Sequence, residues 1–105
     1  MENHTLKSLN FSNCDLGPSG LLAIGTALGN KSALTTLFLS SNAAENEGAK
    51  GLSKGLRRNE TLRYLDISSN RISSEGGTYL AKALEQNKTL TKIVLKENFL
   101  NNKVG

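Results

Sequence analysis

The sequence of 105 residues has few of the residues on which many classes of protein depend. It contains a single cysteine, so no disulfide can form within the chain, and nothing indicates an oxidising compartment. It has no apolar run of about 18 residues, the least that a transmembrane helix needs, and its first residues lack the apolar stretch of a secretory signal. We therefore expect a soluble, cytoplasmic protein with no membrane partner.

Aromatic residues and charge of one sign are also scarce. Hydrophobic residues make up 37% of the chain and aromatic residues 5%, which would serve a closed globule poorly but suits a core of stacked aliphatic side chains. Thirteen Lys and Arg against nine Asp and Glu leave a net charge of +4, which is spread along the chain. Binding of nucleic acid usually needs a denser basic stripe with stacking aromatics, so we expect no nucleic-acid partner.

The chain lacks the clusters of residues that carry catalysis or bind a metal. No His, Cys and carboxylates have the spacing of metal ligands, and no glycine-rich phosphate loop occurs, so neither a metal nor a cofactor is predicted. Cys14 could be a nucleophile with the sole histidine, His4, as its base. However, His4 lies well before it in the chain, and no acid has a defined spacing that would orient it. We expect no catalytic residue and no enzyme.

What the sequence does contain is one segment repeated along its length. In residues 62–87, the alternating Leu62, Leu65 and Ile67 predict a short strand with one buried face, and a helical pattern follows. The same pattern starts at Leu34 and at Leu6, and its first half returns at Leu90, so the period is constant. We expect strands near 8–10, 36–38, 64–66 and 92–94, and helices near 19–30, 47–58 and 75–86.

The repeated apolar positions predict the core. Each unit buries about six large aliphatic side chains, a gross gain of roughly 10–15 kcal/mol. Ordering the backbone and side chains of a whole unit costs a similar or larger sum, so a single unit cannot fold alone and the units must stack. The strand positions expected to face inward form three columns: Leu6, Leu34, Leu62 and Leu90; Leu9, Leu37, Leu65 and Ile93; and Phe11, Leu39, Ile67 and Leu95.

The repeated unit resembles the leucine-rich repeat, whose pattern is L-x-x-L-x-L-x-x-N/C-x-L with a period of about 20–29 residues. With its period of 28, its helical second half and the recurring Gly20, Gly48 and Gly76, it is similar to the ribonuclease-inhibitor-like subfamily. That subfamily includes the repeats of NOD-like receptors and of Ran GTPase-activating proteins. The resemblance implies an α/β fold, a right-handed solenoid or horseshoe segment with parallel strands on the concave face and helices on the convex face.

The same resemblance implies one domain over residues 1–105. Its repeats would span about 6–33, 34–61 and 62–89, with a partial repeat over 90–105, and we expect it to be part of a longer array. It also implies a structural role for the column of Cys14, Asn42, Asn70 and Asn98. In the family, this side chain turns inward and hydrogen-bonds the backbone of neighbouring turns, where buried amides need partners. We therefore expect Cys14 to be buried and unreactive.

Function is left to the solvent face of the predicted sheet. Most outward strand positions are small and polar, but Phe38, Tyr64 and Val94 are not. Aromatic side chains on a rigid sheet are frequent anchors of protein interfaces. Two other interpretations stay open, because exposed apolar residues are common on any surface and these residues could simply cover one another. The predicted protein-binding residues are Phe38, Tyr64, Asp66, Lys92 and Val94.

Two further surfaces are candidates. One is the basic helix face, which is either a second contact surface or a solvated face; it comprises Lys50, Lys54, Arg57 and Arg58. The other is the C-terminal edge, where the last strand has no helix of its own. There we expect Leu95, Phe99 and Leu100 to form an exposed apolar patch, which further repeats, a capping helix or a second copy of the chain would cover.

Two classes of function follow from the resemblance. The first is a protein-interaction scaffold whose protein partner the sequence does not identify. The second is a GTPase-activating or other regulatory leucine-rich-repeat protein. No position carries more than the shared scaffold pattern, so no functional residue of the Ran-activating proteins can be assigned to this chain.

Overall fold

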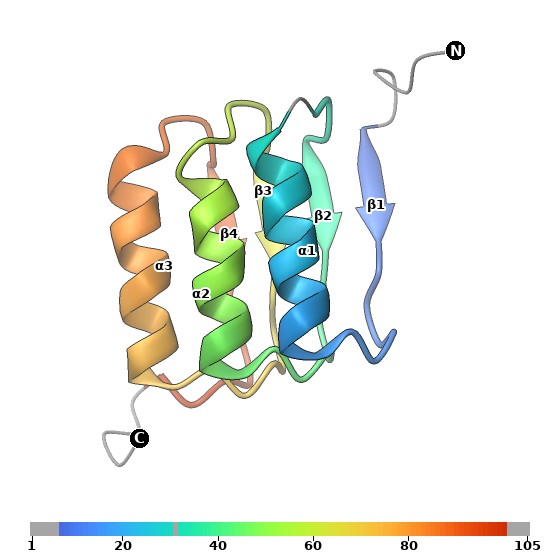
Figure 1. Cartoon of the computed structure of the whole chain (residues 1–105), viewed down its shortest axis with the longest axis vertical. Coiled ribbons are helices and arrows are strands. Elements are labelled where there is room, and N and C mark those ends of the chain that lie inside the picture. The colour runs from blue at the N-terminus through green and yellow to red at the C-terminus, as the bar shows by residue number, and fades with distance from the viewer. Residues whose placement is uncertain (1–6, 31, 101–105) are drawn as a thin grey trace.

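The structure is a computed structural model that describes residues 7–30 and 32–100 (Figure 1). Strands and helices alternate along the chain: β1 (Ser8–Asn10), α1 (Gly17–Gly29), β2 (Thr36–Phe38), α2 (Glu45–Leu56), β3 (Tyr64–Asp66), α3 (Ser74–Gln86) and β4 (Lys92–Val94). The four strands form one parallel sheet in the order of the sequence, and the three helices form a second layer on one side of it. The predicted strands are confirmed residue for residue.

The register of the sheet equals the period of the repeat. Ser8 pairs with Thr36, Thr36 with Tyr64, and Tyr64 with Lys92. Each step across the sheet is therefore one repeat, so every position of the unit stacks on the same position of the next unit. Columns read from the sequence are columns in space, and the predicted stacking of α/β units is confirmed.

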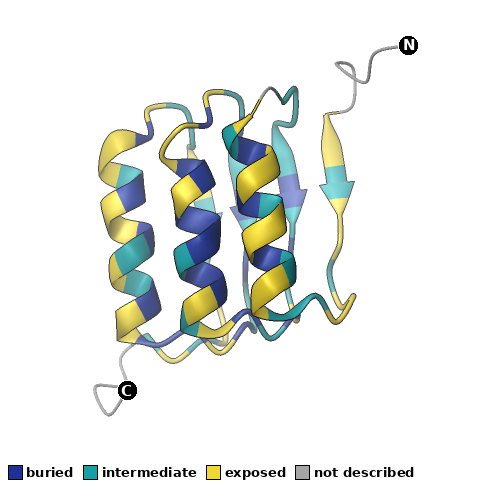
Figure 2. Ribbon diagram, in the orientation of Figure 1, coloured by how far each residue is buried: buried dark blue, intermediate teal, exposed yellow. Residues whose placement is uncertain are grey.

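The core lies between the two layers and is aliphatic, and it fades toward both ends of the solenoid (Figure 2). Leu37, Leu65 and Ile67 on the inner face of the sheet are at most 1% exposed, whereas Leu9 in β1 and Ile93 in β4 are half-buried. Two residues named in the analysis of the sequence, His4 and Leu6, lie outside the described residues. Within the described part of the chain, no helix is long and apolar enough to cross a membrane.

The first two helices begin two residues earlier than the sequence predicts. Gly48 is predicted at the entry of its helix, but it is the fourth residue of α2. Its glycine is needed for packing, because a Cβ there would lie 2.8 Å from the Cβ of Ala44 and 3.2 Å from the Cβ of Leu21. The chain enters the two helices through residues of positive φ, Gly17 at 67° and Glu45 at 60°.

The C-terminal edge is better covered than the sequence predicts. Leu95 and Leu100 are half-buried and pack against the core, so the expected apolar patch is wrong except for Phe99, which is 51% exposed. The chain beyond β4 stays attached to the preceding unit, since the Phe99 N–H donates to the Ile72 carbonyl oxygen at 2.7 Å. Leu100 also reaches the first turn of α3, where a Cβ on Gly77 would lie 2.8 Å from its Cδ2 atom.

The opposite end of the solenoid is the more open one. β1 stands clear of the helical layer, whereas α3 stands at the other end of the molecule (Figure 1). Behind β1, a cleft of about 180 Å³ is lined by Leu9, Phe11, Ile24 and Leu34 among others. Phe11 is predicted to face the core but is 37% exposed. The cause is the lack, among the described residues, of any helix on the outer side of α1 that would cover it.

Candidate protein-binding face

The face of the sheet turned away from the helices, here called the sheet face, brings together all five predicted binding residues. They come from three neighbouring strands. Phe38 of β2 pairs with Asp66 of β3, and Asp66 pairs with Val94 of β4. Tyr64 pairs with Lys92 in the same register. Because side chains two residues apart on a strand share a face, these residues form one surface.

An aromatic pair occupies the centre of the sheet face. The ring centroids of Phe38 and Tyr64 are 5.5 Å apart, and the ring planes are inclined by 51°. The two residues are diagonal neighbours on β2 and β3, a relation that long side chains can bridge. Each ring covers part of the other, yet both side chains remain half-buried. The pair is therefore a prearranged apolar platform with surface left for a partner.

The polar residues around the pair are held to different degrees. The carboxylate of Asp66 accepts a hydrogen bond from the Ser68 N–H at 3.0 Å, which fixes its orientation at the end of β3. Asp66 forms no other hydrogen bond or ion pair with the described residues, so most of its accepting capacity is free. Lys92 is exposed and Val94 half-buried. The sheet face thus combines an apolar centre with a carboxylate and an ammonium group.

A ladder of asparagines fixes the turns that follow the strands. The Asn70 side chain is fully buried; its Oδ1 accepts from the N–H groups of Asn42 at 2.9 Å and Ala44 at 3.2 Å. Its Nδ2 donates to the carbonyl oxygens of Leu39, Ile67 and Ser68 at 2.9–3.0 Å. These bonds join two repeats just where strand pairing ends, so the ladder holds the ends of β2 and β3 in place.

Cys14 occupies the first position of this ladder, but its predicted burial is wrong. Its N–H donates to Asn42 Oδ1 at 3.0 Å, as the column requires, and its thiol lies 3.4 Å from the Ser12 carbonyl oxygen. The residue is nevertheless exposed. Asn42 and Asn70 reach back to carbonyl groups of the preceding unit and are buried by it. Among the described residues, no unit precedes Cys14.

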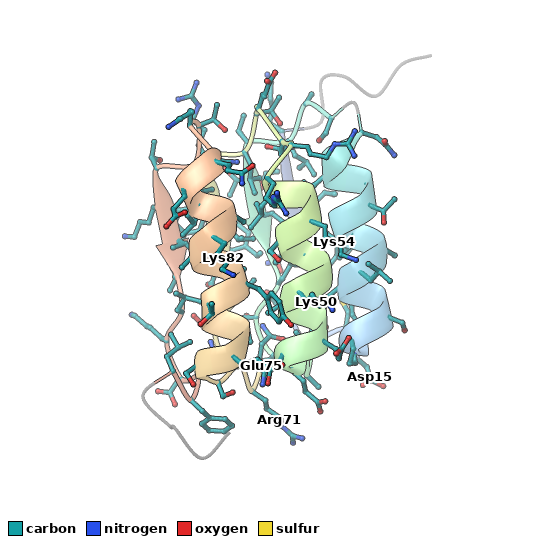
Figure 3. All side chains as sticks on the ribbon, turned by 60° about the vertical axis from the view of Figure 1, so that its left-hand side comes forward. Asp15, Lys50, Lys54, Arg71, Glu75 and Lys82 are labelled. Carbon is teal, nitrogen blue, oxygen red and sulfur yellow. The ribbon has the colours of Figure 1, made fainter. Side chains whose placement is uncertain are left out.

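The basic helix face is less uniform than the sequence suggests. Lys54, Arg57 and Arg58 are exposed, whereas the Lys50 ammonium group lies 5.6 Å from the centre of the Tyr79 ring on α3. That distance is typical of a cation–π contact. Lys50 and Lys54 lie on the outer side of α2 (Figure 3).

The contact between α1 and α2 was not predicted from the sequence. A Cβ on Gly51 would lie 2.8 Å from the Leu22 Cα atom, and a Cβ on Gly55 would fall on the carbonyl oxygen of Gly25. The two helices therefore meet backbone to backbone. The signal was present in the sequence, because Gly51 and Gly55 are four residues apart, as are Gly25 and Gly29.

Comparison with known proteins agrees with this architecture. A family model described as "Leucine Rich repeat" matches residues 2–25 and residues 58–81. The two matches begin two repeat periods apart, so they fall on the same positions of the first and third units. The fold is a leucine-rich-repeat solenoid. Comparison with curated protein sequences finds no match.

A solved leucine-rich-repeat structure extends the likeness over nearly the whole chain. Its title reads "Leiomodin-1 Actin-Binding Site 2 (ABS2)", its TM-score is 0.83, and the sequences are 24% identical. The match covers 98% of this chain and 59% of that one, so this chain spans less than two thirds of the length of the protein it matches. At that identity the likeness establishes the fold.

Proposed function

We propose that this chain is a non-catalytic protein-interaction module that binds a partner through Phe38, Tyr64, Asp66, Lys92 and Val94 on the sheet face. The observation that carries the proposal is the aromatic pair, whose rings are 5.5 Å apart on two hydrogen-bonded strands. A preordered pair of aromatic residues loses little conformational entropy on binding and can act as an anchor. The constant repeat period further supports placing the chain in the ribonuclease-inhibitor-like subtype.

The size of the sheet face limits its affinity. Four strands about 4.8 Å apart span only about 14 Å. A standard interface buries roughly 800 Å² on each partner, which is more than this face offers without its flanking loops. We therefore expect weak binding by this chain, or a contact surface that continues over further repeats of a longer array.

Actin is the first partner to examine, because the leucine-rich-repeat domain of leiomodin-1 is described as an actin-binding site. The second class of function, stimulation of a GTPase, is supported only by the likeness of the repeats to those of Ran GTPase-activating proteins. An assay of GTP hydrolysis with and without this chain separates the two.

We predict that Phe38→Ala and Tyr64→Ala each weaken binding of the partner by about 2 kcal/mol or more, roughly 30-fold in Kd, because each removes half of the anchor. Titration of labelled actin with the wild-type chain and with each variant measures the change. Ser8→Ala is the matched control, since Ser8 lies on the same face at the far strand β1 and is exposed. Binding of actin that is equal in the wild type and both aromatic variants would place the contact on the loops or the helices.

We also predict weak end-to-end self-association through the C-terminal edge. The outer side of β4 has no strand beside it among the described residues, and unpaired strand edges are templates for another chain. Phe99 adds an exposed apolar side chain at this edge, and Lys92 and Lys96 oppose pairing by their charge. Sedimentation equilibrium should show an average mass that rises with concentration and falls again in Phe99→Asp. A mass that stays monomeric throughout contradicts the prediction.

A further inference from the structure

A continuous groove follows the contact between α1 and α2 on the outer side of the helical layer. It consists of three adjoining hollows. The first, of about 310 Å³, shares Leu22, Gly51 and Lys54 with the second, of about 180 Å³. The second shares Gly29 and Arg58 with the third, of about 420 Å³, at the carboxyl ends of the helices. The groove therefore runs along the full length of the helix pair.

The floor of the groove is backbone. Gly25, Gly51 and Gly55 line its middle hollow without side chains. The helices are already in contact there, since a Cβ on Gly51 would lie 2.8 Å from the Leu22 Cα atom. A ligand that lies along the helix contact can thus approach the main chain closely, with its side chains turned toward the two rims.

The two rims of the groove differ in charge. On the α2 side, Lys50, Lys54 and Arg58 follow one another at intervals of four residues and so share one side of the helix. On the α1 side, the helix Gly17–Gly29 contains no charged residue, and Leu22 is 47% exposed. Within residues 7–30 and 32–100, none of the three cations forms an ion pair. One rim is therefore basic and the other apolar.

Charge also changes along the groove. Glu47 lines the first hollow, so negative charge opposes an anion at that end. Lys54 and Arg58 dominate the other two hollows. The carboxyl ends of α1 and α2 add a partial negative charge of about half a unit each, which is less than the two full positive charges of these side chains. The groove favours an acidic ligand over its middle and its carboxyl end.

We propose that this groove binds a short extended segment of another protein with acidic residues at alternate positions. Successive cations of the α2 rim are about 6 Å apart along the helix axis, and alternate side chains of an extended peptide are about 6.6–6.8 Å apart. Carboxylates on one side of such a peptide can therefore meet Lys54 and Arg58 together. The intervening side chains turn to the opposite rim, where an apolar one contacts Leu22.

An extended peptide fits this groove better than a single phosphate group does. Phosphate recognition needs several donors that converge on one point. Here the cations are a helical turn apart, and the floor belongs to the middle of two helices, where backbone N–H groups already have partners within the helix. The groove lies on the helical layer, opposite the Phe38–Tyr64 pair on the sheet face, so the inference does not depend on the proposed function.

The test uses the complete chain and the labelled hexapeptide acetyl-Ala-Leu-Glu-Ala-Glu-Ala-amide, with binding followed by fluorescence anisotropy at low salt. We expect binding that weakens as salt is added and that is lost when both glutamates of the peptide are glutamines. Lys54→Glu should weaken binding by about tenfold, because attraction becomes repulsion, and Leu22→Ala should weaken it to a smaller extent.

Lys82→Glu is the matched control. Lys82 is exposed on α3, outside the groove, and its reversal changes the net charge of the chain by the same amount as that of Lys54 (Figure 3). We expect Lys82→Glu to bind the peptide as the wild type does. An equal loss in Lys82→Glu and Lys54→Glu, equal binding of the glutamine peptide, or no binding by the wild-type chain would overturn the proposal. Displacement of the peptide by equimolar inorganic phosphate would overturn it in favour of a simple anion site.

Discussion

Asn70→Ala is expected to lower the free energy of unfolding by about 3–5 kcal/mol, because it breaks five hydrogen bonds inside the core at once. The Asn70 side chain satisfies three carbonyl groups and two N–H groups of two successive repeats. Asn70 is 0% exposed, so water cannot replace it without opening the structure. A buried polar group left without a partner costs roughly 1–3 kcal/mol, and partial relaxation keeps the total below the sum.

Thermal unfolding followed by circular dichroism measures this loss. A decrease of about 3 kcal/mol corresponds to a fall in Tm of roughly 12 °C or more in a domain of this size. The same column of the repeat provides two controls. Asn98→Ala should cost less, because Asn98 is half-buried and water can reach the groups it leaves. Cys14→Ala should be nearly neutral, because Cys14 is exposed. Equal losses in all three variants would show that burial does not set the strength of the ladder.

Gly55→Ala is expected to destabilise the protein by about 2–3 kcal/mol, although alanine is the better helix former. Its Cβ would fall on the carbonyl oxygen of Gly25, a backbone atom that cannot rotate away, so α1 and α2 must move apart. Overpacking of this kind costs about 3 kcal/mol or somewhat more, and the gain in helix propensity of about 1 kcal/mol offsets only part of it.

Gly29→Ala is the matched control and should have the opposite sign. A Cβ at Gly29 would lie 3.6 Å from the Gly55 Cα atom and 3.9 Å from the Arg58 Cδ atom, which is ordinary van der Waals contact. The substitution should therefore raise the free energy of unfolding by up to about 1 kcal/mol. Urea unfolding of both variants gives the two values. Stabilisation by Gly55→Ala would mean that the helices are not in backbone contact.

The two predictions concern different directions of packing in the same solenoid. The asparagine ladder joins the turns of successive repeats, while the glycines set how closely the helices of the first two repeats approach. The second effect also bears on the groove, whose floor contains Gly51 and Gly55. A variant that separates α1 from α2 should therefore widen the groove and weaken binding of the acidic peptide, while the sheet face keeps its Phe38–Tyr64 pair.

The sequence by itself determined the strands, their parallel order and the columns that join them. A strict repeat period forces each position to stack on its own copy, so Leu37 on Leu65 and Asn42 on Asn70 follow from counting alone. It also placed the five binding residues on one face of the sheet, because side chains alternate along a strand. Their role in binding stays a prediction.

Only the tertiary structure decided what depends on neighbours that the period does not specify. Cys14 follows the column pattern but is exposed, because burial requires a unit on its outer side. Phe38 and Tyr64 touch because side chains on adjacent strands can lean diagonally, which a column pattern does not encode. Gly25 and Gly55 are necessary only because α1 and α2 come into backbone contact, and that distance is set by the packing of both helices on the sheet.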